Sequence, residues 1–257
     1  MEKQFVSTDA AVPSFERDDN IDLSIIIPVF NNANFTKLAL EGLTKLSNKY
    51  EIVIVDNNST DNTAEMVDGF VVNTPKDRAR VVFISSPINL GFGASNNKAL
   101  KHAKGRNILF LNNDIRIDDK FETWPEELVR LAEEGYIVCT QGGVLDKKFN
   151  FVKEGKGLPQ TDYWYCSGWC LGGSRETFEK LALSKDGVWE VWNKKYFLYF
   201  EDVDLTWRAK KLGIKIKEID VPVYHFGRMT GRKFNMFGYY KKSQKIMRQE
   251  WAERYKP

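Results

Sequence analysis

The sequence has few cysteines and no long apolar run, and each shortage narrows the class of protein. Three cysteines, Cys139, Cys166 and Cys170, stand among 257 residues. This odd, low number argues against a disulfide framework and fits a reducing cytosol. No second Cys or His pair accompanies Cys166 and Cys170, so no zinc site is expected. Without a run of about 18 apolar residues or a signal-peptide core, the chain is expected to be cytoplasmic, with buried, reduced thiols.

The excess of positive over negative charge is also small. The formal net charge is +3, which is too small to predict nucleic-acid binding. Hydrophobic residues make up 42% and charged residues 28% of the chain, as in ordinary soluble globular domains. The positive excess gathers with aromatic residues in a C-terminal tail, residues 232–257. This tail predicts either a helix packed back on the domain with a solvated basic face, or a peripheral contact with an anionic membrane.

The first half of the chain alternates between apolar runs and segments with helical spacing. The runs are rich in β-branched residues and apolar throughout, as expected of strands covered on both faces of a parallel sheet. Strand–helix alternation of this kind is the signature of a doubly wound α/β fold. After a loose polar arm at residues 1–20, we expect residues 21–118 to form a nucleotide-binding half. Its predicted strands are residues 23–29, 51–56, 81–84 and 107–111, and its predicted helices are residues 36–46 (with Thr36 as N-cap), 62–67 and 94–103.

The second half, residues 119–231, is less regular. Residues 142–172 contain many glycines and aromatic residues, which is typical of loops with short strands. An alternating segment near residue 216 predicts a half-exposed strand. The predicted helices are residues 121–135, 176–183 and 202–212, and the predicted strands are residues 137–140 and 214–219.

Two carboxylates, Asp56 and Asp114, follow apolar strands at their carboxyl ends. Open α/β sheets bind ligands at this edge. A carboxylate there is a hard oxygen donor suited to Mg²⁺ or Mn²⁺ carrying a diphosphate, although Asn and Asp are also common in turns. In one crevice the two acids can divide the work, one accepting hydrogen bonds from a base or sugar and the other binding metal.

An acidic pair, Glu201 and Asp202, stands at the start of the predicted helix 202–212. The helix dipole stabilises acids at this position, which is the structural interpretation. The chemical interpretation is a carboxylate that takes a proton from an attacking hydroxyl. Aromatic residues before the pair would either pack against a sugar face or belong to the core. These residues are Trp192, Tyr196, Phe197, Tyr199 and Phe200.

Five motifs, in order along residues 22–226, resemble those of the inverting glycosyltransferases of family 2. They are Ser24–Asn31, Ile54–Asp61, Asn89–Asn97, Leu111–Asp114 and Phe200–Arg208. The resemblance implies the GT-A fold, an α/β architecture with a Rossmann-like, doubly wound, mostly parallel central sheet flanked by helices. It also implies a smaller mixed portion, in residues 119–231, that binds the acceptor and carries the catalytic base.

The resemblance implies a nucleotide site at the ends of the first strands. Pro28, Phe30 and Asn31 would lie beside the base, and Asp56 would hydrogen-bond it. The family often has Tyr where Phe30 stands, so a hydroxyl contact is lost here. The ribose and diphosphate pocket would be lined by Asn89, Gly91 and Asn97.

The resemblance also implies a divalent-cation site, for Mn²⁺ or Mg²⁺. Asn112, Asn113 and Asp114 occupy the family's Asp-x-Asp position, with Asn112 replacing the first acid and Asp114 matching the metal-binding acid. His225 would complete a mixed oxygen and nitrogen site, although a lone His is more often an ordinary surface or core residue. Arg228 would neutralise the departing diphosphate.

On the acceptor side, the resemblance assigns the general base to Asp202. Glu201, Trp169 and Gly172 are expected near the acceptor, where the Trp169 ring would stack on a sugar. Packing of Trp169 in the core is the structural alternative. The implied reaction moves a sugar from a UDP- or dTDP-linked donor to a hydroxyl of a glycan or lipid-linked acceptor, in the synthesis of a cell-surface polysaccharide or glycolipid.

Two other functions are compatible with parts of the pattern. A sugar nucleotidyltransferase also uses a doubly wound sheet and a metal, but it needs a glycine-rich, basic loop after its first strand, and residues 28–32 contain neither glycine nor a basic residue. A non-catalytic nucleotide-sugar-binding scaffold would tolerate the loss of Asp202. The sequence predicts neither the sugar nor the oligomeric state.

Overall fold

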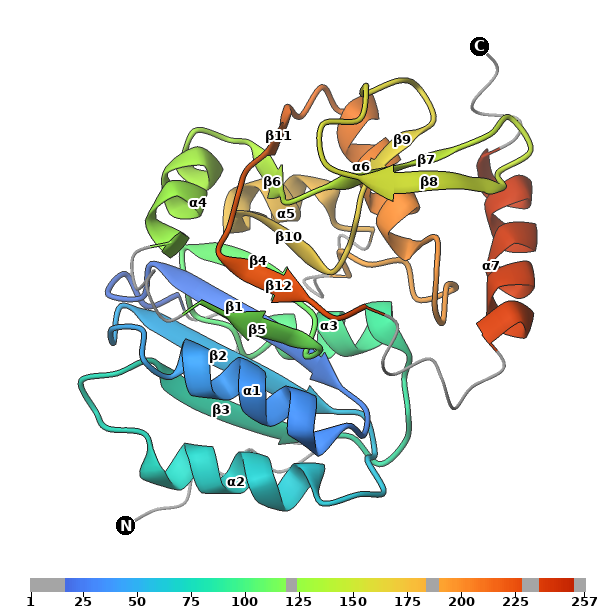
Figure 1. Ribbon diagram of the computed structural model, residues 1–257. Coiled ribbons are helices and arrows are strands. Elements are labelled where there is room, and N and C mark those ends of the chain that lie inside the picture. The colour runs from blue at the N-terminus through green and yellow to red at the C-terminus, as the bar shows by residue number, and fades with distance from the viewer. Residues whose placement is uncertain (1–16, 119–123, 184–189, 228–235, 252–257) are drawn as a thin grey trace.

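The computed structural model describes residues 17–118, 124–183, 190–227 and 236–251. They form a central seven-stranded sheet with helices packed on it (Figure 1). The strand order is β11-β6-β10-β4-β1-β2-β3. Neighbours among β1 to β4 are parallel, β11 is parallel to β6, and β10 runs antiparallel to both β4 and β6. The mostly parallel, doubly wound sheet is therefore confirmed. Its strands are β1 (Leu23–Val29), β2 (Tyr50–Asp56), β3 (Arg80–Ser85), β4 (Asn107–Leu111), β6 (Ile137–Cys139), β10 (Cys170–Ser174) and β11 (Ile216–Glu218).

Helices cover both faces of this sheet, which is why its central strands contain no polar alternation. Along β1, Ile25 and Ile27 belong to one buried apolar cluster while Ile26, between them, belongs to another. The first cluster packs under α1 (Ala33–Leu43), α2 (Thr63–Asn73) and α4 (Trp124–Glu133). The second packs under α3 (Phe92–Leu100), α5 (Arg175–Leu181) and α6 (Glu201–Lys211).

Two small sheets accompany the central sheet, and one of them brings His225 to Asp114, just after β4. A two-stranded antiparallel sheet pairs β5 (Ile115–Ile117) with β12 (Val223–His225), and its register places His225 opposite Ile115. A three-stranded sheet in the order β8-β7-β9 contains β7 (Gly142–Leu145), β8 (Phe151–Gly155) and β9 (Trp164–Cys166). The expected short strands within residues 142–172 are thus present.

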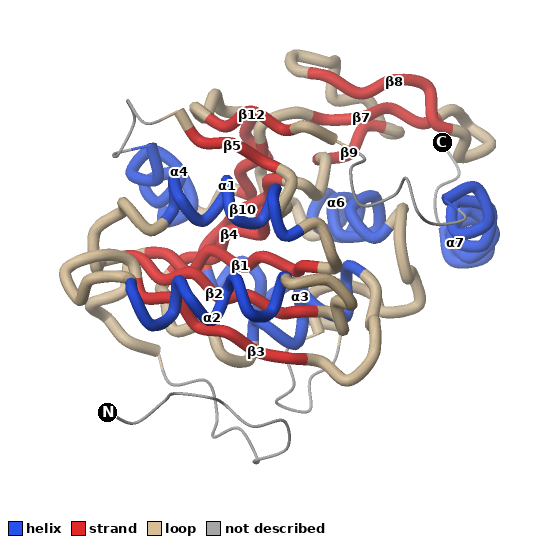
Figure 2. The backbone as a smooth tube through the Cα atoms, turned by 60° about the horizontal axis from the view of Figure 1, so that its bottom comes forward, coloured by secondary structure: helices blue, strands red, loops and turns tan. Residues whose placement is uncertain are grey.

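The C-terminal helix α7 (Met236–Trp251) packs back on the domain. Both ribbon and tube views place it beside the β7–β8 hairpin, away from α1 and α2 (Figure 1, Figure 2). Ser243 donates a hydrogen bond to the Leu198 carbonyl oxygen (2.8 Å), and Trp251 packs at ring edge against Trp207. Of the two interpretations of the tail, packing on the domain is confirmed for residues 236–251, while membrane contact stays a prediction. Residues 232–235 and 252–257 lie outside the described residues.

Helix boundaries differ from the sequence prediction where the chain turns sharply. The first helix begins at Ala33 rather than after Thr36, because Asn31 and Asn32 adopt left-handed backbone angles (φ 56° and 65°) and turn the chain directly from β1 into α1. Thr36 lies in the first turn and donates its hydroxyl to the Asn32 carbonyl oxygen instead of capping. Helix α2 continues to Asn73, past the predicted end at Val67, and Phe70 and Val71 in the added part pack against the first cluster.

All three cysteines are buried free thiols, as predicted. Among the described residues there is no helix with both the length and the apolarity needed to cross a membrane.

Candidate active site

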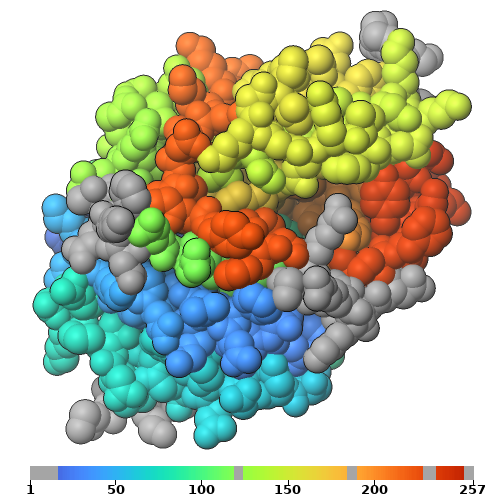
Figure 3. Space-filling view, in the orientation of Figure 1, coloured from blue at the N-terminus to red at the C-terminus, as the bar shows by residue number. Residues whose placement is uncertain are grey.

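A cavity of about 220 Å³ lies at the carboxyl ends of β1 and β4. On the outside of the molecule, the surface is hollowed between β12, the β7–β8 hairpin and α7 (Figure 3). The cavity wall is more apolar than polar, and its polar groups come mainly from the strand-end segments. The sequence-predicted residues in its lining are Pro28, Phe30, Asn89, Gly91, Asn112, Asn113 and Asp114.

Asp114 and His225 meet in the polar part of the site. Asp114 Oδ1 lies 3.1 Å from His225 Nε2, and the Asn112 side-chain nitrogen lies 3.4 Å from the same ring atom. Pairing of β5 with β12 creates this contact, because it sets His225 across from the residue that follows Asp114. Asp114 is buried, with 3% of its surface exposed.

This donor set suits part of a divalent-cation shell. Mg²⁺ and Mn²⁺ take several oxygen or nitrogen ligands and commonly share them among protein, water and substrate phosphates. In the part of the chain that the structure describes, no group of three or more His, Cys, Asp or Glu side chains could hold a metal alone. Asp114 and His225 would therefore supply the protein's share, leaving the remaining positions for a diphosphate and water.

Trp169 contacts His225 rather than standing open to an acceptor. The two rings stack with centroids 4.4 Å apart and planes 13° apart, and Trp169 is 7% exposed within the apolar cluster under α1 and α4. Gly172 also differs from its predicted role. It lies buried in β10, and a Cβ there would meet the Ile108 carbonyl oxygen at 3.1 Å and Leu128 at 3.2 Å, so close packing of the sheet explains this glycine.

The acidic pair at the start of α6 has two different environments. Asp202 is partly exposed, and its Oδ2 accepts a hydrogen bond from the Gly168 backbone N–H at 3.1 Å. Burial raises the pKa of Asp202 to about 7, and the Gly168 hydrogen bond offsets part of that rise. Burial, followed by repulsion from Asp202, raises the pKa of Glu201 well above its ordinary value. Glu201 is 6% exposed and has its Cβ near Gly93 of α3, a position that does not favour the predicted acceptor contact.

Three residues assigned to the nucleotide make hydrogen bonds within the protein and are not among the residues that line the cavity. Asn97 donates to the Trp192 carbonyl oxygen (2.7 Å) and accepts from the Trp192 N–H (2.9 Å), so both ends of its amide are engaged and it does not line the cavity. Asn31 Oδ1 accepts from the Thr60 N–H at 2.7 Å and holds the turn after β2. Asp56 accepts from the Ser59 N–H, and burial raises the pKa of its carboxyl.

Sequence reasoning named Phe197 among the aromatic residues before the acidic pair but missed the residues that form a cavity wall with it. Phe197 and Tyr239 stack with ring centroids 4.8 Å apart and both line the cavity, as does Met236 at the start of α7. Asn57 lines it next to Asp56, although the motif pointed to Asp56 alone. No local signal marks Tyr239, because it lies far along the chain from the strand ends. The predicted diphosphate residue Arg228 falls outside the described residues.

Gly91 brings this wall close to the start of α3. Its backbone is left-handed (φ +80°), and a Cβ would lie 2.3 Å from the Phe197 carbonyl oxygen, which also accepts the Phe92 N–H at 2.9 Å. We expect Gly91→Ala to lower the free energy of unfolding by about 2 kcal/mol, since only glycine adopts this conformation without strain. Denaturant unfolding measures the effect.

The control for that measurement is Gly69→Ala in α2, where a Cβ meets nothing within 4 Å. Helix propensity predicts that this change is neutral or stabilises by up to about 1 kcal/mol. Equal stability of the two variants would contradict the close-approach argument for Gly91.

Comparison with known proteins places this chain in a family. The family model Glycosyl transferase family 2 matches residues 24–182. The chain is 31% identical over 140 residues to the GalNAc(5)-diNAcBac-PP-undecaprenol beta-1,3-glucosyltransferase of Campylobacter jejuni, a match covering 53% of this chain and 43% of that protein. It is 24% identical over 245 residues to the dolichyl-phosphate beta-glucosyltransferase ALG5A of Trichomonas vaginalis, covering 89% of this chain and 73% of that one.

Solved structures show the same fold. The mannosyltransferase PcManGT of Pyrobaculum calidifontis, in complex with GDP-Man and Mn²⁺, superimposes with a TM-score of 0.55 at 18% identity, over 80% of this chain and 58% of that one. The chain spans less than half the length of the Campylobacter relative. The matched region begins in β1, passes through the strand-end residues of the cavity and ends just beyond α5, and it covers more than half of the chain. The chain therefore belongs to glycosyl transferase family 2.

Proposed function

We propose that this protein is an inverting glycosyltransferase that moves a sugar from a UDP- or dTDP-linked donor to a hydroxyl of a glycan or lipid-linked acceptor. One observation carries the proposal. Asp114 and His225 pair at the strand ends, and Trp169, stacked on His225, is the chain neighbour of Gly168, which hydrogen-bonds Asp202. The candidate cation site and the candidate base therefore contact two consecutive residues, Trp169 and Gly168.

The donor's nucleotide is assigned to the cavity. Pro28, Phe30 and Asn57 line its β1–β2 side, where the base would sit, with Asp56 behind them as the proposed hydrogen-bonding acid. The diphosphate would then reach Asp114 and His225. A divalent cation bound there would stabilise the charge on the departing nucleotide diphosphate. Arg228, outside the described residues, stays a predicted contributor to the same charge balance.

Asp202 is assigned the proton transfer. As the acceptor hydroxyl oxygen forms a bond to the anomeric carbon, its proton passes to the Asp202 carboxylate, and the bond from that carbon to the diphosphate oxygen breaks. A single displacement of this kind inverts the anomeric configuration. A base with a pKa of about 7 suits the task, because a general base works best when its pKa lies near the operating pH.

Lipid-linked acceptors are proposed from the relatives. The Campylobacter protein is named for an undecaprenol-linked substrate and the Trichomonas protein for dolichyl phosphate. These names support a role in cell-surface polysaccharide or glycolipid synthesis. Peripheral membrane contact through residues 232–257 is a separate prediction, which liposome sedimentation with and without the tail would test.

The test of the donor site is a thermal-shift panel with UDP, dTDP and GDP, each with and without Mn²⁺. One nucleotide class should stabilise the protein and Mn²⁺ should strengthen the shift, since a ligand at 100 times its Kd adds about 2.7 kcal/mol of stability. Asp114→Asn and His225→Gln should lose the Mn²⁺-dependent part. His102→Gln is the matched control, because His102 is the other of the two histidines and follows the far end of α3.

Product analysis separates the proposal from its rivals. The expected products from a nucleotide sugar and an acceptor are the free nucleotide diphosphate and a glycoside of inverted configuration, seen by NMR. Pyrophosphate released from a nucleoside triphosphate and a sugar 1-phosphate would identify a nucleotidyltransferase. Nucleotide binding without turnover on any acceptor tried would favour the scaffold.

A further inference from the structure

A three-residue turn, Ser167 to Trp169, joins β9 to β10 and contacts Asp202, His225 and Asn112. The Gly168 N–H donates to Asp202 Oδ2 at 3.1 Å. The Trp169 ring stacks on His225, and the Trp169 carbonyl oxygen accepts the Asn112 N–H at 2.8 Å. The proposed base, the proposed metal-binding histidine and the strand-end motif thus all touch two consecutive residues.

The turn is held firmly on both sides. Before it, the Cys166 N–H donates to Thr206 Oγ1 (3.0 Å), and the Thr206 hydroxyl donates in turn to the Asp202 carbonyl oxygen (2.7 Å), so β9 is tied to the first turn of α6. After it, Cys170 pairs with Leu111 at the end of β4. The position of the turn is therefore fixed by contacts with both α6 and the central sheet.

A side chain at residue 168 would be packed tightly against its neighbours. A Cβ there would lie 3.0 Å from Asp202 Cβ and 3.6 Å from the Trp192 ring. The absence of a Cβ at Gly168 favours this close approach of the backbone to Asp202. The Gly168 N–H donates to Oδ2 and the Val203 N–H donates to Oδ1 at 2.9 Å, so both carboxylate oxygens of Asp202 accept backbone hydrogen bonds.

Trp169 contacts His225 through the face of its indole ring and not through a hydrogen bond from the indole N–H. The indole Nε1 is buried without a hydrogen-bond partner in the structure, and leaving a buried donor unpaired costs free energy. The ring is nevertheless packed flat on the imidazole. His225 ends a three-residue strand in which Tyr224 is 59% exposed, so the stacked indole adds a packing contact to a short, partly exposed strand.

From these contacts we propose that the Gly168–Trp169 turn is a positioning element that sets the base and the metal-binding pair relative to each other. Trp169 holds the His225 ring against Asp114, and Gly168 holds the Asp202 carboxylate. The inference rests on the proposed function and adds to it that two neighbouring residues affect different steps. Damage at Trp169 weakens cation binding, whereas damage at Gly168 slows turnover and leaves cation binding intact.

The first experiment observes the His225 ring in the metal-free protein by NMR. With two histidines in the chain, the His102→Gln variant assigns the remaining imidazole signals to His225. Stacking on an indole should shift these signals upfield. Trp169→Leu should abolish the shift and Trp169→Phe should retain part of it. An unchanged shift in Trp169→Leu would overturn the positioning role of Trp169, whatever the enzyme's activity.

The second experiment measures Mn²⁺ affinity in the presence of the stabilising nucleoside diphosphate. Loss of a group that orients a metal ligand typically weakens binding 10- to 100-fold, so we expect at least about a 10-fold rise in the Mn²⁺ Kd for Trp169→Leu and a smaller rise for Trp169→Phe. Trp124→Leu is the matched control. Trp124 is also 7% exposed in the same apolar cluster and also has an unpaired Nε1.

Trp124→Leu should lower the stability of the protein about as much as Trp169→Leu does, but it should leave the Mn²⁺ Kd unchanged. Equal Kd values for Trp169→Leu and Trp124→Leu would overturn the inference. No Mn²⁺ binding by the wild-type protein would instead overturn the cation in the proposed function, while the NMR result would still decide whether Trp169 positions His225.

The third experiment uses Gly168→Ala, with Gly155→Ala as control because a Cβ at Gly155 meets nothing within 4 Å. The added methyl group would push Asp202 away from the turn. We expect kcat to fall at least 10-fold for Gly168→Ala, with the Mn²⁺ and nucleotide Kd values within twofold of wild type. A parallel loss of Mn²⁺ affinity, or a kcat equal to that of Gly155→Ala, would contradict the assignment of Gly168.

Discussion

Replacing Asp202 by Asn is expected to lower kcat by about 10²- to 10⁴-fold, the usual contribution of a positioned general base. The amide keeps the size of the side chain and can still accept the Gly168 N–H through its oxygen, but it cannot take the acceptor's proton. Nucleotide and Mn²⁺ binding should stay near wild type, because Asp202 is not among the residues that line the cavity. Steady-state kinetics and thermal shifts on the same samples measure both effects.

The pH profile gives the same assignment an independent check. Since burial raises the pKa of Asp202 to about 7, the wild-type rate should fall as the pH drops below about 7 and level off above it. The contribution of Asp202 to folding stability changes with pH in the opposite direction to the rate. A carboxyl whose folded-state pKa exceeds its unfolded value favours the folded state most at low pH, and this contribution is lost as the pH rises from about 4 to about 7. Asp202→Asn should therefore be at least as stable as wild type at pH 8.

The matched control is Asp77→Asn, the same chemical change at an exposed residue between α2 and β3. Its kcat, pH profile and stability should match wild type. Near-normal turnover of Asp202→Asn would show that another group is the base, and an unshifted pH profile together with lost activity would point to a binding role for Asp202.

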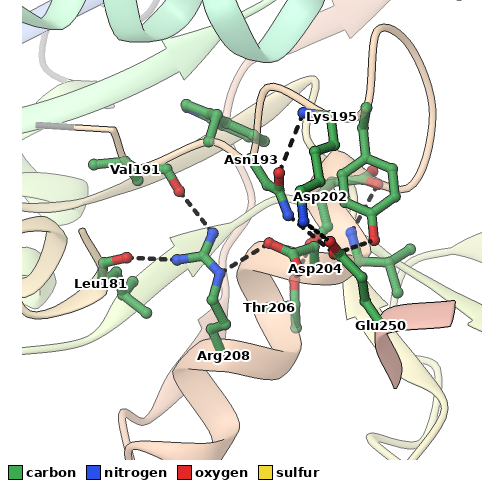
Figure 4. Close-up of polar contacts among 12 residues, drawn as sticks. Leu181, Val191, Asn193, Lys195, Asp202, Asp204, Thr206, Arg208 and Glu250 are labelled. Atoms are coloured by element: carbon green, nitrogen blue, oxygen red, sulfur yellow. Dashed lines mark hydrogen bonds and ion pairs between the residues drawn. The ribbon is translucent and has the colours of Figure 1, made fainter. Parts of the chain in front are cut away.

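Replacing Arg208 by Met is expected to lower the free energy of unfolding by about 3–5 kcal/mol, the cost of breaking a buried ion pair from one side. Arg208 donates to Asp204 Oδ2 (2.8 Å) and to the carbonyl oxygens of Leu181 and Val191 (2.5 and 2.6 Å) (Figure 4). The Arg208 and Asp204 side chains are 15% and 4% exposed. The change would leave the Asp204 carboxylate with the Trp251 indole N–H (2.9 Å) but without its cation.

Denaturant unfolding at pH 7 measures this loss. The matched control is Lys180→Met in α5, which removes the exposed i,i+4 pair between Glu176 and Lys180 and should cost less than about 0.5 kcal/mol. In the double variant Asp204→Asn/Arg208→Met, part of the loss should be recovered, because no uncompensated charge stays buried. Equal losses for Arg208→Met and Lys180→Met would contradict the argument.

The Arg208 pair also links the site to the end of the chain. Asp204 joins Arg208 and Trp251, so α6 is tied at once to the segment after α5 and to α7. The carboxylate of Glu250 adds contacts to Asn193 and Lys195 in the loop before α6 (Figure 4). Helix α7, which lies outside the matched family region, thus supports α6 and the acidic pair at its start. Changes that loosen α7 should therefore affect the site.

The sequence by itself determined the parallel strands β1 to β4 of the central sheet, but not β10, which lies between β4 and β6. Strands β1 and β4 match their predicted bounds, because residues such as Ile25, Ile26 and Ile27 point alternately to two buried faces and must all be apolar. It also determined that Asp114 stands at a strand end, since the position of a carboxylate relative to a buried strand is a local property.

Only the tertiary structure decided which side chains serve the site. Asn97 looked like a pocket residue and is bound to Trp192, while Trp169 looked like an acceptor platform and is stacked on His225. Tyr239 carried no signal and completes the cavity wall. Each of these contacts joins residues more than 40 positions apart. Local periodicity reports only which face of an element is buried, and the partner on that face is chosen by how the whole chain packs.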